Sequence, residues 1–99
     1  MAFLALASQK TLLTLQLNFL QFRNLSISNQ RIICSDQMSA VQKNSSYEDA
    51  TEDPNYVYWE QMDEKLDTEQ ASLESQMTAI QNEISSLKTL VNNNIKTAC

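Results

Sequence analysis

The sequence predicts an all-α fold: two long helices joined by an acidic linker form an antiparallel helical hairpin, or coiled coil, that pairs into a four-helix bundle. Apolar residues return every seven positions in both halves of the chain, which is the period of a helical seam. The 99 residues include no glycine, so tight turns with positive φ are disfavoured. The one proline, Pro54, marks a single break between two long segments.

The first helix is predicted over residues 1–45. Within it, the stretch "TLLTLQLNFLQF" (residues 11–22) alternates apolar and polar residues as a strand does. A heptad repeat runs through the whole segment, however, and is longer than any ordinary strand. The predicted seam residues on this helix are Leu13, Leu17, Leu20 and Ile27. Asn24 is a polar residue of the same seam and is predicted to fix the helix register.

A second apolar row explains the strand-like appearance of this stretch. Leu12, Leu15, Phe19 and Phe22 are spaced 3, 4 and 3 residues apart, which places them on one side of a helix, nearly opposite the seam. We call these four residues the outer stripe. Because one partner helix cannot cover two opposite faces, the outer stripe is the candidate interaction surface.

An acidic linker containing the proline is predicted over residues 46–55. Asp53 and Pro54 form its hinge, with Asp53 as the N-cap of the second helix and Pro54 at the first helical position. Of the charged residues, the first 43 positions carry four cations and one acid, and the remainder carries eleven acids and three lysines. The two halves are therefore expected to face each other, or else to leave a solvated acidic surface.

The second helix is predicted over residues 56–99, and the two helices and linker are expected to form one structural unit. Its seam contains one polar residue, Gln70, which is predicted to fix register together with Asn24. The apolar seam residues are Leu66, Leu73, Met77, Ile80, Ile84, Leu87 and Val91. One antiparallel alignment sets Leu13 beside Val91, and an alignment displaced by one heptad is almost as favourable.

The residues that most catalytic and metal sites require are missing. The chain has no histidine, which removes the usual general base and most zinc sites, and no glycine for a phosphate-binding loop. No catalytic, cofactor-binding or metal-binding residue is predicted, and the chain is not expected to be an enzyme. Cys34 falls in the seam and is expected to be a core residue. An aromatic cluster near the linker either closes the hairpin or anchors a partner protein: Tyr47, Tyr56, Tyr58 and Trp59.

These features favour a structural or protein-interaction protein that self-associates as a scaffold, adaptor or small assembly subunit. The expected partner is protein, either a second copy or another helical protein. Nucleic acid is not expected because neither half is strongly basic, and a membrane surface is disfavoured because the first helix has no cationic polar face. With two cysteines and no disulfide framework, a cytoplasmic location is expected.

The alternative is a secretion-associated protein, either an exported substrate or a small helical chaperone. In size and hairpin plan, the chain resembles the two-helix substrates of type VII secretion. It departs from them at Trp59-Glu60-Gln61, where a Trp-x-Gly turn would be needed. This resemblance implies export by a route that does not use a signal peptide.

Overall fold

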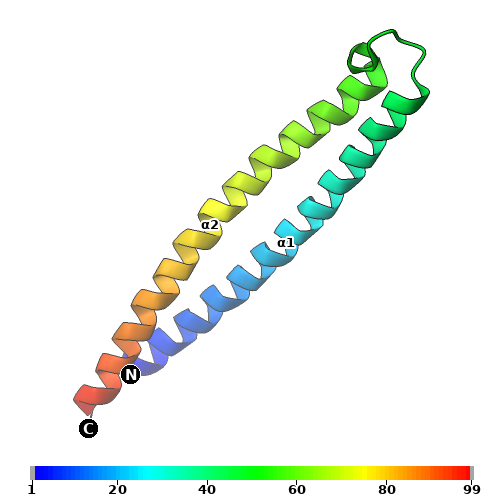
Figure 1. Cartoon of the computed structure of the whole chain (residues 1–99). Helices are drawn as coiled ribbons and strands as arrows, with labels where there is room; N and C mark the ends of the chain where they lie inside the picture. The colour runs from blue at the N-terminus through cyan, green and yellow to red at the C-terminus, as the bar shows by residue number, and fades with distance from the viewer. Residues whose placement is uncertain (1, 99) are drawn as a thin grey trace. The chain divides into compact units, whose positions relative to one another are not determined.

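The computed structural model describes the backbone of residues 2–98 and the side chains of residues 4–93. Helix α1 spans Ala2–Asn44 and helix α2 spans Pro54–Ala98, and a short 3₁₀ helix, η1, lies between them at Ala50–Glu52 (Figure 1). The predicted all-α hairpin is confirmed, since the chain forms two long helices that are joined by a short linker and run antiparallel (Figure 1); pairing into a four-helix bundle stays a prediction.

The start of α2 is fixed by Asp53. One side-chain oxygen of Asp53 accepts the backbone N–H of Asn55 at 2.9 Å, and its backbone carbonyl accepts the N–H of Val57 at 3.0 Å. Pro54 is the first residue of α2, where the missing N–H costs nothing. The second carboxylate oxygen of Asp53 accepts the Ser45 hydroxyl at 2.7 Å. The buried Asp53 therefore ties the beginning of α2 to the residue that follows α1.

The linker turns without glycine because side-chain oxygens satisfy its backbone. The N–H of Ser45 donates to the Val41 carbonyl at 2.8 Å, which continues the hydrogen bonding of α1 by one residue. The Asp49 carboxylate accepts the backbone N–H of Thr51 at 3.0 Å and its hydroxyl at 2.6 Å, and so caps η1. These two hydrogen bonds lower the pKa of Asp49 below its ordinary value, and the bond from the Thr51 hydroxyl has the larger effect.

The chain divides into two compact bodies. The terminal body contains residues up to Arg23 together with those from Leu73 onward, and the linker body contains Asn24–Ser72. Each body has an antiparallel pair of segments from α1 and α2, with a thin apolar core between them. The buried apolar residues are Leu20, Leu73 and Ile80 in the terminal body, and Ile27, Cys34 and Leu66 in the linker body.

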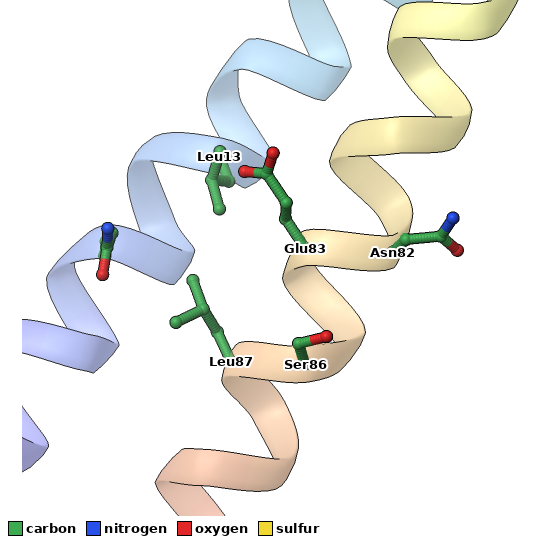
Figure 2. Close-up of a pocket in the computed structure, with 6 residues that line it drawn as sticks. Leu13, Asn82, Glu83, Ser86 and Leu87 are labelled. Atoms are coloured by element: carbon green, nitrogen blue, oxygen red, sulfur yellow. The ribbon is translucent and has the colours of Figure 1, made fainter.

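The alignment of α1 with α2 differs from the one predicted. Leu13 was expected beside Val91, but it lines an open hollow of about 310 Å³ with Leu87, one helical turn earlier on α2 (Figure 2). The linker body shows the same displacement: the predicted alignment would set Cys34 beside Gln70, but Cys34 lies with Leu66, one turn earlier on α2. The predicted alignment is therefore wrong by about one turn, and in the observed alignment Arg31 of α1 reaches Asp63 and Gln70 of α2.

Candidate functional site

The outer stripe of α1 lies on the surface of the terminal body. Its side chains are exposed to 66% at Leu12, 60% at Leu15, 63% at Phe19 and 72% at Phe22. In contrast, Leu13 and Leu17, which fall between them in sequence, are half-buried and Leu20 is buried. The strand-like pattern of this stretch thus arises from two rows of apolar side chains on opposite faces of one helix.

Polar residues beside the outer stripe are satisfied within α1. The Thr11 hydroxyl donates to the Ala7 carbonyl at 3.0 Å, and the Thr14 hydroxyl donates to the Lys10 carbonyl at 2.9 Å. Such bonds let a β-branched residue sit in a helix without an unpaired hydroxyl. Two hydroxyl groups beside the stripe therefore already have hydrogen-bond partners within α1.

The apolar surface is unevenly shared between the helices. Among residues with described side chains, α2 contributes Tyr58 and Leu90 to the large exposed hydrophobics. All the others apart from Tyr47 of the linker belong to α1: Leu4, Leu12, Leu15, Phe19, Phe22, Leu25, Ile32 and Ile33. The outward face of α2 in the terminal body carries small and polar residues, for example Thr78, Asn82 and Ser85. Among the described side chains of this body, the row of exposed large hydrophobics therefore lies on α1.

The other predicted seam residues lie between the helices. Leu66, Leu73 and Ile80 are buried, together with Leu20 and Ile27 of α1. The half-buried residues of α2 are Met77, Ile84, Leu87 and Val91. All the buried apolar residues of the described chain recur at sevens with Leu20 or Leu66. The other residues of the seam, for example Leu13, Leu17 and Leu87, are half-buried.

A polar cluster interrupts the seam of the linker body at Arg31. Its guanidinium donates to both carboxylate oxygens of Asp63, at 2.9 and 3.3 Å, and to Asp67 at 2.9 Å. The same group donates to the side-chain oxygen of Gln70 at 3.0 Å. The hydrogen bond that Arg31 donates to the Asp63 carboxylate is the main cause that raises the pKa of Arg31. The heptad pattern placed Arg31 in the seam but predicted no partner for it, since partners depend on alignment.

The two predicted register residues have different surroundings. The side-chain oxygen of Gln70 accepts a hydrogen bond from Arg31, and its side-chain nitrogen donates to the Ser28 hydroxyl at 2.8 Å. Asn24 is half-buried, and its side-chain oxygen has no hydrogen-bond partner among the described residues. An unpaired buried oxygen costs stability. Gln70 therefore links the helices through hydrogen bonds, whereas the Asn24 oxygen does not.

Cys34 is the most deeply buried side chain of the linker body, with 1% of its surface exposed. It lines a hollow of about 150 Å³ with Ile33, Trp59, Met62 and others from the two helices. Burial raises the pKa of the Cys34 thiol, and the nearby Asp63 carboxylate acts in the same direction. A buried thiol with a raised pKa is a poor nucleophile, so its surroundings are those of a core residue.

The aromatic cluster is only partly packed. Trp59 is half-buried and meets Tyr58 edge to face, with ring centres 5.1 Å apart and an interplanar angle of 82°. Tyr56 is half-buried, whereas Tyr47 and Tyr58 are largely exposed. Both interpretations of this cluster, as a plug of the hairpin or as an anchor for a partner protein, stay predictions.

Within the described part of the chain, no three or more His, Cys, Asp or Glu side chains are grouped so as to hold a metal ion. Neither helix, over its described residues, has an apolar run long enough to cross a bilayer. Comparison of the chain with protein-family models, with curated proteins and with solved structures gave no match. The outer stripe is therefore the candidate functional site.

Proposed function

We propose that the chain is a non-enzymatic protein-interaction protein that self-associates through the outer stripe and acts as a scaffold, adaptor or small assembly subunit. The single observation that carries this proposal is the exposure of Leu12, Leu15, Phe19 and Phe22 on one side of α1. A large apolar row in water is costly, and soluble chains commonly hide such a row against a protein partner.

The exposed area is close to what a small dimer interface needs. With roughly 200 Å² for a whole leucine or phenylalanine, the four exposed fractions correspond to about 500 Å². Two copies that cover each other's stripe would bury about 1,000 Å² in total, which is the lower bound for a specific interface. Leu4, exposed to 61% on the same side of α1, extends the area that a partner can cover.

The charges around the stripe also favour a second copy. Between Leu4 and Phe22 the one charged residue is Lys10, which is half-buried on the side of α1 that faces α2. Two identical stripes can therefore approach without repulsion between like charges. A membrane surface is less suitable as the partner, because interfacial helices usually flank their apolar face with several cations.

The test is the mass in solution of a double variant, Phe19→Ser/Phe22→Ser. Both side chains point away from the core, so the variant should keep much of its helical circular dichroism. If each truncated ring costs about 1 kcal/mol in each of two copies, the dissociation constant should rise roughly 1,000-fold.

The matched control is Tyr47→Ser, which removes an aromatic ring exposed to 48% outside the stripe. This variant should associate like the parent chain. Equal association of the parent and the double variant would contradict the proposal. Flotation of the parent with lipid vesicles, lost in the double variant, would assign the stripe to a membrane surface instead.

A further inference from the structure

The spacing of the four residues in the outer stripe is symmetric about its centre. Counting along α1, the intervals are 3, 4 and 3, so Leu12 and Phe22 are equally far from Leu17, as are Leu15 and Phe19. All four are exposed on the same side of the helix. A row with this spacing is compatible with a two-fold axis that crosses the helix beside position 17.

We infer that two copies pair antiparallel, α1 against α1, about a two-fold axis beside Leu17, so that Leu12 meets Phe22 and Leu15 meets Phe19 of the second copy. This inference rests on the proposed self-association and adds its geometry. It differs from a bundle in which all four helices share one core, because α1 lies at the centre of the dimer and α2 packs outside it.

Side-chain size favours the antiparallel arrangement. It sets a leucine against a phenylalanine at each of the four contacts, and facing large and small residues interdigitate well. A parallel pair in register would instead set phenylalanine against phenylalanine and leucine against leucine, which leaves wide and narrow places along the interface. Since the stripe has no charge, size is the property that distinguishes the two directions.

The position of the stripe on α1 supports a dimer in which the two α1 helices lie at the centre. The stripe lies opposite the face that holds Leu13, Leu17 and Leu20, so α2 and a second copy can contact α1 at the same time. The outward face of α2, with Thr78, Asn82 and Ser85, offers a second copy little apolar surface. A shared core of four helices would need an apolar face there.

A mixing experiment tests the direction of pairing. The variants Leu12→Lys and Phe22→Glu each place two unpaired charges in an antiparallel dimer, so each alone should be monomeric. Mixed together, they place one lysine against one glutamate and restore the native contact at the other end, so the mixture should form a one-to-one dimer. A parallel pair offers the lysine no glutamate, and absence of a dimer in the mixture would overturn the inference.

Distances between spin labels give a second, independent measurement. Labels are placed at exposed Ser8 or Asn18 in a chain whose own cysteines are replaced, Cys34→Ala and Cys99→Ser. Antiparallel pairing predicts an offset along the helices of about 27 Å between the two Ser8 labels and about 3 Å between the two Asn18 labels.

The possible outcomes distinguish antiparallel pairing from self-association itself. A long distance for Ser8 with a short one for Asn18 supports antiparallel pairing. Short distances for both positions would show parallel pairing, which overturns the inference and leaves self-association standing. A chain that is monomeric at every concentration, with no dipolar signal between copies, would overturn the proposed function itself.

Discussion

The chain offers a matched pair of isoleucines that tests which face of α1 forms the core. Ile27 and Ile32 lie on the same helix in the linker body, but Ile27 is exposed to 3% and Ile32 to 59%. Ile27→Ala removes buried atoms and leaves a cavity, and in a core this thin we expect a cost at the lower end of the usual range, about 2–3 kcal/mol. Ile32→Ala leaves no cavity and introduces a better helix former, so its effect should stay within about 0.5 kcal/mol.

Thermal and urea unfolding, followed by circular dichroism at one fixed protein concentration, measure the difference. For a chain of about 100 residues, 2–3 kcal/mol corresponds to a fall in Tm of roughly 10–20 °C for Ile27→Ala. The concentration must be held constant because association adds to apparent stability. Equal shifts for the two variants, or a larger shift for Ile32→Ala, would refute the packing of Ile27 between the helices.

Three further predictions concern the linker body. Arg31→Met removes the donors to Asp63 and should lower the urea midpoint, with a smaller loss in high salt; an unchanged midpoint would contradict a role for this ion pair. Asp49 should titrate below its ordinary pKa and contribute stability that is lost as pH falls through that lowered pKa. In an NMR titration, Thr51→Val should raise the pKa of Asp49 and Thr51→Ser should not; identical values in all three chains would refute the cap. In a Cys99→Ser chain, Cys34 should react with iodoacetamide far more slowly when folded than in urea, and equal rates would contradict its burial.

The fold could be predicted from sequence because its signal is periodic and long. The repeat through Leu13, Leu20 and Ile27 cannot be accommodated by a strand, and the absence of glycine leaves few ways to turn. The outer stripe could be found in the same way, since Leu12 to Phe22 follow helical spacing on the opposite side. Which molecule covers that stripe is not encoded in a single chain's pattern, so the partner is a proposal.

The alignment of the helices could not be predicted, because several alignments bury the same number of leucines. The structure sets Leu13 with Leu87 and Cys34 with Leu66, so that residues recurring at sevens with Leu20 on α1 meet those recurring at sevens with Leu66 on α2. Lys10 and Arg31 occupy alternate positions of the same heptads and are half-buried, and the charged end of Arg31 bonds to Asp63 and Asp67 of α2.

The observed alignment includes contacts that have no periodic signal in the sequence. Ser45 bonds to Asp53 across the linker, and Arg31 bonds to Asp63 and Asp67 in the neighbouring seam. Each of these depends on which residues the fold brings together, so the sequence could supply the opposite charges but not their pairing.

Sedimentation equilibrium of the unmodified chain, recorded together with circular dichroism over a wide range of concentration, tests self-association most directly. We predict strongly helical spectra and a mass that rises from 11.3 kDa toward twice that value as concentration increases. A chain that is fully helical yet remains at 11.3 kDa at the highest concentration would contradict the proposal that the outer stripe binds a second copy.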